Sequence, residues 1–105
     1  MPSAHILLVD DDALLRRSLV LNLEDAGYRA SAAATAEDAL ALATRHRPDL
    51  VLLDLIMPLG GGLAILQNMR GGDDGADIPV IVISGANDAG LIGQVEALGI
   101  DHFFP

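Results

Sequence analysis

The feature that most constrains this chain is an apolar run ending in a carboxylate, Leu50 to Asp54. A strand with one wet face alternates apolar and polar residues. Four apolar residues in a row therefore indicate a strand buried on both faces, as in a parallel sheet covered by helices. Side chains just past the carboxyl ends of such strands line the ligand crevice. Asp54 is thus expected where open α/β sheets carry out chemistry, although a single Asp at this place more often caps the next turn.

The rest of the chain alternates predicted strands with predicted helices. The other strands are expected at residues 5–9, 28–33, 79–83 and 100–104, and the small, mixed residues of 28–33 suggest a sheet edge. Helices are expected after Asp12, with Leu15, Leu19, Leu23 and Ala26 at helical spacing, and at 35–46, 63–70 and 87–98. Asp12 and Thr35 are the predicted N-caps, and Gly27 is the predicted stop of the first helix.

This alternation, with short loops, predicts an α/β fold with a parallel sheet and helices on both faces. The 105 residues allow one domain with one core. No cysteine is present, which excludes disulfides and thiolate metal sites. The apolar runs are too short to span a bilayer and no signal peptide is visible, so a cytoplasmic protein without membrane contact is expected.

The charge of the chain is strongly negative, at −9, with no lysine and six scattered arginines. That balance argues against a nucleic-acid surface within these residues. Clustered carboxylates instead favour a hard cation with oxygen ligands.

Three of the predicted strands end in polar groups that can meet at one edge of the sheet: Asp10 and Asp11, Asp54, and Ser84. Carboxylates about 4 Å apart repel each other by roughly 4 kcal/mol at an effective dielectric constant near 20. A divalent cation such as Mg²⁺ removes that cost. A carboxylate can also act as a nucleophile and form an acyl phosphate. The simpler readings are that Asp10 and Asp11 are solvated loop residues, Asp12 a helix cap and Ser84 a turn residue.

Three motifs together resemble the receiver domain of bacterial response regulators. They are Val9 to Asp12, Pro48 to Pro58, and Pro79 to Gly85, in the family's order and spacing. The resemblance implies a flavodoxin-like five-stranded sheet of order 2-1-3-4-5. It implies that Asp54 accepts a phosphoryl group from a histidine kinase or phosphotransfer protein. In the same way, it makes Asp10, Asp11, Asp54 and the backbone carbonyl of Ile56 ligands of Mg²⁺, Ser84 the switch hydroxyl and Phe103 the switch aromatic.

Two departures from the family pattern affect these expectations. Gly60-Gly61 replaces a bulkier pair, which implies a looser loop. The family also places a Lys one residue beyond Pro105, followed by a proline and a fifth helix, and these are absent from the 105 residues. The resemblance thus implies a receiver domain over residues 1–105 that is incomplete at its C-terminus and marginally stable alone. Phosphorylated receivers commonly dimerise through this end, so a homodimer is among the expected partners.

Rival functions remain open at this stage. A fold-retaining interaction module without productive phosphotransfer is favoured by the missing Lys and opposed by the intact carboxylates. A phosphatase with an Asp nucleophile commonly has a second Asp two residues later, where this chain has Ile56. A flavin site needs a phosphate-binding loop after the first strand, where three aspartates would repel the phosphate. We therefore expect a regulatory domain, not an enzyme beyond its own phosphorylation and dephosphorylation. His5, His46 and His102 are dispersed and are expected at the surface or at strand ends.

Overall fold

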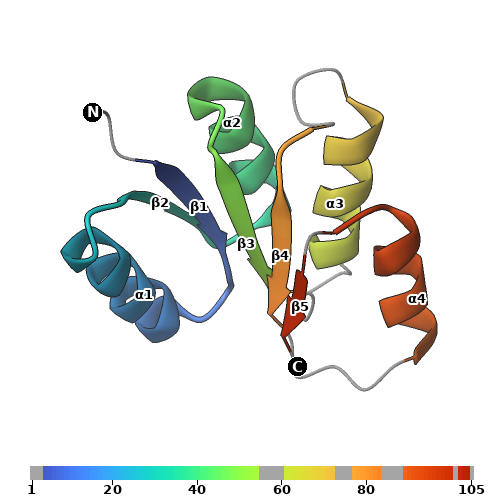
Figure 1. The fold of residues 1–105 in the computed structure, drawn as a ribbon, viewed down its shortest axis with the longest axis horizontal. Coiled ribbons are helices and arrows are strands. Elements are labelled where there is room, and N and C mark those ends of the chain that lie inside the picture. The colour runs from blue at the N-terminus through green and yellow to red at the C-terminus, as the bar shows by residue number, and fades with distance from the viewer. Residues whose placement is uncertain (1–3, 55–60, 73–76, 84–88, 101, 105) are drawn as a thin grey trace.

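The computed structural model describes residues 4–54, 61–72, 77–83, 89–100 and 102–104. Its parallel sheet has five strands in the order β2-β1-β3-β4-β5 (Figure 1). The strands are β1 (His5–Val9), β2 (Arg29–Ala33), β3 (Leu50–Asp54), β4 (Val80–Ile83) and β5 (His102–Phe104). The helices are α1 (Ala13–Asp25), α2 (Ala36–His46), α3 (Gly61–Gly71) and α4 (Ala89–Ala97). The predicted flavodoxin-like strand order, with Arg29–Ala33 at an edge, is confirmed.

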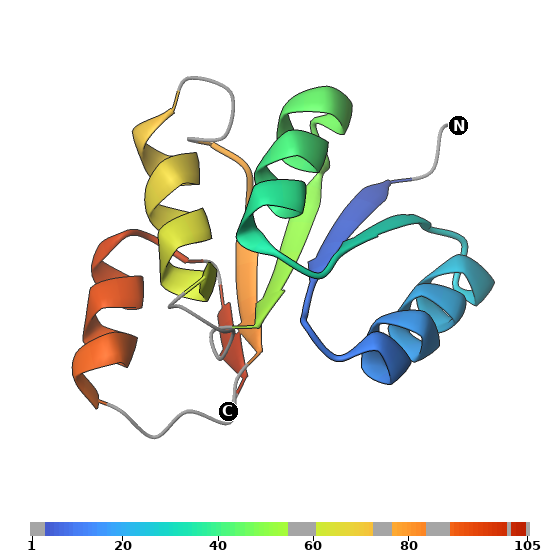
Figure 2. The same ribbon diagram turned by 180° about the vertical axis from the view of Figure 1, so that it is seen from behind.

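The helices form two layers on the sheet. α2, α3 and α4 lie on one side, and α1 lies on the other, beside β1 and β2 (Figures 1 and 2). Among the described residues, no helix has the length and apolar character needed to cross a bilayer.

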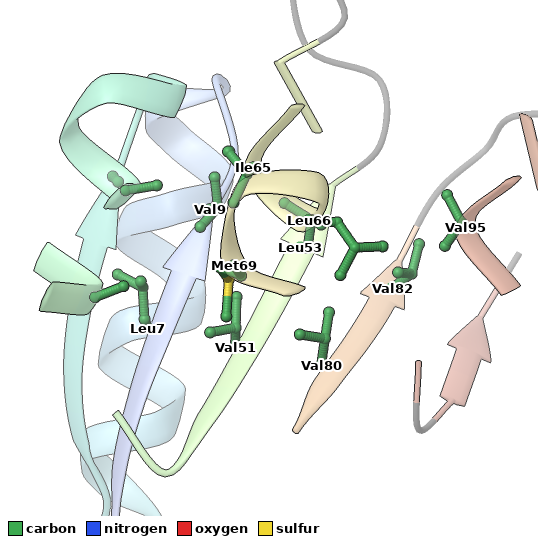
Figure 3. Close-up of a cluster of buried hydrophobic side chains, with 13 residues drawn as sticks. Leu7, Val9, Val51, Leu53, Ile65, Leu66, Met69, Val80, Val82 and Val95 are labelled. Carbon is green, nitrogen blue, oxygen red and sulfur yellow. The ribbon is translucent and has the colours of Figure 1, made fainter. Parts of the chain in front are cut away.

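The main core lies between the sheet and the α2–α3–α4 layer (Figure 3). The strand register places Leu7 beside Val51 and Val51 beside Val80, so these three side chains share one face of the sheet. Ile65, Leu66 and Met69 of α3 cover that face and are at most 3% exposed, which confirms their predicted burial. Full burial of side chains of this size is the main favourable term in folding.

The opposite face of the sheet is covered unevenly. Ile6 and Leu8 of β1 are buried beneath α1. Leu52 and Ile81 are only half-buried on the same side, and Ile83 is 40% exposed. The prediction that Leu50 to Leu53 is buried on both faces is therefore wrong for one face. The reason is that α1 packs mainly on β1 and β2, at some distance from β3 and β4.

The predicted helix caps are in place. The side chain of Asp12 accepts the backbone N–H groups of Leu14 and Leu15, and that of Thr35 accepts the N–H of Asp38. Gly27 follows α1 with a φ of +96°, a conformation that favours glycine.

Other details differ from prediction. None of the residues of α1, all of which are described, is fully buried, and Leu15 is 44% exposed. α3 extends beyond the predicted Leu63–Arg70 to include glycines at both ends. α4 ends at Ala97, one residue before the predicted Leu98, and its predicted start at Asn87 lies outside the described residues. Ile100, the predicted first residue of the last strand, is not in a strand, and β5 spans His102–Phe104.

Candidate functional site

Two neighbouring strands deliver three carboxylates to the same edge of the sheet. β1 and β3 are hydrogen-bonded partners with Val9 beside Leu53, so Asp10 and Asp54 follow at the same level. Asp11 is the next residue after Asp10. One carboxylate oxygen from each of Asp10, Asp11 and Asp54 lies within 4.8 Å of the others. The predicted convergence of these three residues is therefore present.

The three carboxylates differ in burial. Asp10 is 6% exposed, Asp54 is half-buried and Asp11 is exposed. At this separation a pair of carboxylates repels by roughly 3 kcal/mol at an effective dielectric constant near 20, before screening by salt. Few carboxylates, one of them exposed to water, suit Mg²⁺, which keeps several waters and binds oxygen ligands. The residues present therefore fit a divalent cation.

Asp10 is held in place by hydrogen bonds. Its backbone N–H donates to the carbonyl of Ala33 at 3.1 Å, and its Oδ1 accepts the backbone N–H of Asp12 at 2.9 Å. Asp12, by contrast, turns its side chain to the first turn of α1, which confirms its predicted role as a cap. Only the first two of the three consecutive aspartates thus belong to the cluster.

The remaining predicted site residues are not described in full. Ile56 and Ser84 lie outside the described residues. Phe103 lies on β5 beside Val82 of β4, and its side chain is likewise outside the described part. Their predicted roles stay predictions.

Arg16 is a contributor to this edge that sequence reasoning missed. Its Nη1 donates to the backbone carbonyl of Asp10 at 2.9 Å. The side chain is half-buried on α1. The only indication of this role in the sequence is an arginine in the first turn of a helix that follows an acidic loop, and the neighbouring Arg17 fits that description almost as well.

A second polar cluster lies at the opposite end of the sheet. His5 is the first residue of β1, in line with the expected surface or strand-end position, but it is buried, and its Nε2 lies 2.7 Å from Oγ of Ser31. The ring of His46 meets it edge-on, with centroids 5.4 Å apart. Burial lowers the pKa of His5 below its ordinary value, with Arg29 and His46 adding to the effect and Asp49 opposing it.

Comparison with known proteins decides the family. The sequence profile described as the response regulator receiver domain matches residues 6–105. This chain belongs to the response regulator receiver family. The receiver assignment agrees with the strand order and with the acidic edge described above.

Curated relatives and solved structures support the same family assignment. The receiver domain is 36% identical over 98 residues to the transcriptional regulatory protein KdpE of Mycobacterium tuberculosis, covering 93% of this chain and 42% of that protein. It is 38% identical over 88 residues to AfsQ1 of Streptomyces coelicolor, a transcriptional regulatory protein, covering 84% of this chain and 37% of that protein. A receiver protein structure from Pseudomonas putida matches with a TM-score of 0.91 and 32% identity, covering 98% of this chain and 85% of that one. The chain thus spans well under half the length of these curated relatives.

Proposed function

We propose that this receiver domain is a phosphorylation-dependent signalling switch. In this proposal Asp54 accepts a phosphoryl group from a histidine kinase or phosphotransfer protein in a Mg²⁺-dependent reaction. The observation that supports it most is the convergence of Asp10, Asp11 and Asp54 within 4.8 Å at the carboxyl ends of β1 and β3. Family membership adds the expectation of a phosphorylated response regulator.

The transfer is an exchange of one bond to phosphorus for another. A carboxylate oxygen of Asp54 forms the new O–P bond while the N–P bond of the donor's phosphohistidine breaks, and the imidazole nitrogen keeps the electron pair. The product is an acyl phosphate on Asp54. When bound, Mg²⁺ would offset the negative charge that the phosphoryl oxygens bring to the carboxylates.

Each described carboxylate has a distinct part in this proposal. Asp10, buried and hydrogen-bonded, would supply an oxygen in a fixed position for Mg²⁺. The exposed Asp11 would supply a second oxygen, whose position can adjust to the cation. Asp54 is half-buried, so it combines a fixed strand-end backbone with access for a donor. The backbone carbonyl of Ile56 as a further ligand, the Ser84 hydroxyl bonding the phosphoryl group, and Phe103 responding to it complete the proposal by resemblance to the family.

The output we propose is a change in the protein contacts of the domain. A homodimer through the C-terminal end, beside β5, is one form that this change can take. The matched relatives include proteins named as transcriptional regulators and one named as a chemotaxis protein, CheY4 of Vibrio cholerae, so the fold is compatible with more than one output.

Incubation with acetyl phosphate tests the proposal. The chain is expected to gain the mass of one phosphoryl group in the presence of Mg²⁺, and to gain none when the cation is chelated. Mg²⁺-independent labelling would contradict the proposed role of the carboxylates. The absence of any labelling, also in a version extended beyond residue 105, would favour the alternative of an interaction module without phosphotransfer.

A further inference from the structure

Arg16 links the first turn of α1 to the end of β1. Its Nη1 donates to the carbonyl oxygen of Asp10 at 2.9 Å, while its backbone N–H donates to the carbonyl oxygen of Asp12 at 2.9 Å. The same residue thus contacts both ends of the acidic loop, residues 10–12. The side-chain bond is charge-assisted on the donor side, which makes it stronger than a neutral one.

With this bond, each polar part of the Asp10 backbone has a partner. The N–H is bonded to Ala33, the carbonyl to Arg16, and Oδ1 to the N–H of Asp12. None of these bonds uses Oδ2, and Oδ1, which accepts one N–H, keeps a second lone pair for a cation. The bonds therefore fix the position of Asp10 at the end of β1.

We infer that Arg16 is a positioning residue for the proposed Mg²⁺ site, acting through the backbone of Asp10. Without a cation, Asp10 is repelled by Asp11 and Asp54, whose carboxylate oxygens lie within 4.8 Å. The guanidinium of Arg16 holds the loop against that repulsion and keeps the site in its binding geometry. The inference rests on the proposed function, since it needs Mg²⁺ to bind at this edge.

Arg17 provides the matched control. It carries the same charge on the next position of α1, and its side chain is exposed. Arg16→Met and Arg17→Met each remove one positive charge close to the acidic loop, so any general electrostatic effect on cation binding is shared. Only Arg16→Met removes the bond to Asp10. Arg16→Lys keeps a positive charge and a hydrogen-bond donor at this position.

The first measurement is a Mg²⁺ titration followed by backbone NMR shifts of residues 10–13. Partners that orient metal ligands typically change affinity by roughly 10- to 100-fold, and because this one acts through the backbone we expect Arg16→Met to bind about 3- to 10-fold more weakly. Arg17→Met is expected to bind at least as tightly as the wild type, and Arg16→Lys to recover most of the loss. Equal affinities in Arg16→Met and Arg17→Met would overturn the inference.

The second measurement needs no metal. Amide hydrogen exchange of Asp12, whose N–H bonds Oδ1 of Asp10, is expected to be faster in metal-free Arg16→Met than in Arg17→Met. Unchanged exchange would overturn the positioning role. A wild type that shows no Mg²⁺-dependent shifts in residues 10–13 would overturn the proposed function instead, and the exchange result would still decide whether Arg16 positions Asp10.

Discussion

His5 and Asp49 hold each other by a reciprocal pair of hydrogen bonds at the end of the sheet farthest from the acidic cluster. The backbone N–H of His5 donates to Oδ2 of Asp49 at 2.8 Å, and the backbone N–H of Asp49 donates to the carbonyl oxygen of His5 at 2.8 Å. The His5 ring is bonded to Ser31 and faces His46. This end of the fold thus joins β1, β2, α2 and the residue before β3.

The cluster of His5, Ser31, His46 and Asp49, called the His5 cluster below, predicts a loss of stability on acidification. The fold keeps the pKa of His5 below its ordinary value of 6.5, chiefly through burial. The unfolded chain therefore takes up a proton at a higher pH than the folded chain does. The stabilising contribution is complete above the unfolded pKa and is lost as the pH falls through the lower, folded value.

Thermal unfolding between about pH 8 and about pH 5.5 measures this effect, a range in which histidine dominates the titration. His5→Gln is expected to flatten the pH dependence, and His46→Gln to flatten it in part, because His46 contributes to the lowered pKa. His102→Gln, which removes a histidine outside the cluster, serves as the control. If all three variants keep the slope of the wild type, the cluster is not its source.

Asp12 is expected to contribute to stability and not to cation binding. Its side chain accepts the N–H groups of Leu14 and Leu15 at 3.0 and 3.1 Å. Replacing such an N-cap by Ala costs about 1 kcal/mol, whereas Asn is nearly as good a cap as Asp. The free energies of unfolding of Asp12→Ala and Asp12→Asn, measured with denaturant, should therefore differ by about 1 kcal/mol. Equal stabilities would contradict the assigned cap.

Much of the fold follows from the sequence because the strong signals are local. The apolar strands, the Asp12 and Thr35 caps and the turn at Gly27 each depend on a few neighbouring residues, and all are present, the strands with small differences in their bounds. The sequence also predicted the convergence of Asp10 and Asp54, because the carboxyl ends of parallel strands meet at one edge of the sheet.

The features that were missed depend on contacts distant in the chain. The ring of the buried His5 bonds Ser31, 26 residues away, which no local pattern indicates. Leu52 is half-buried because α1 packs on β1 and β2, and an apolar run does not reveal which helix covers it. The bond from Arg16 to Asp10 requires the loop geometry between them.

The half-buried side of β3 and β4 predicts low stability for the 105-residue chain. Leu52, Ile81 and Ile83 are incompletely covered there, and full burial of one such side chain contributes roughly 1.5–3 kcal/mol. Total domain stability is only about 5–15 kcal/mol. We therefore expect residues 1–105 to be marginally stable as a monomer. Thermal unfolding and mass in solution test this expectation, and a stable, cooperative monomer at micromolar concentration would contradict it.

Asp11 is expected to be needed for Mg²⁺ binding, unlike its neighbour Asp12. Asp11→Asn and Asp12→Asn each remove one negative charge from the same loop, but only Asp11 belongs to the carboxylate cluster. A Mg²⁺ titration should show at least about tenfold weaker binding for Asp11→Asn and a small change for Asp12→Asn, in line with loss of a direct ligand. Similar affinities in the two variants would place the cation elsewhere.

The position of the phosphoryl group tests the proposed phosphorylation switch most directly. The wild type and Asp54→Asn are incubated with acetyl phosphate and Mg²⁺, in a version extended beyond residue 105 as well as in residues 1–105, and the modified residue is mapped by mass spectrometry. We expect a single phosphoryl group on Asp54 and no labelling of Asp54→Asn. Label that persists undiminished in Asp54→Asn, or that maps to Asp10 or Asp11 in the wild type, would contradict it.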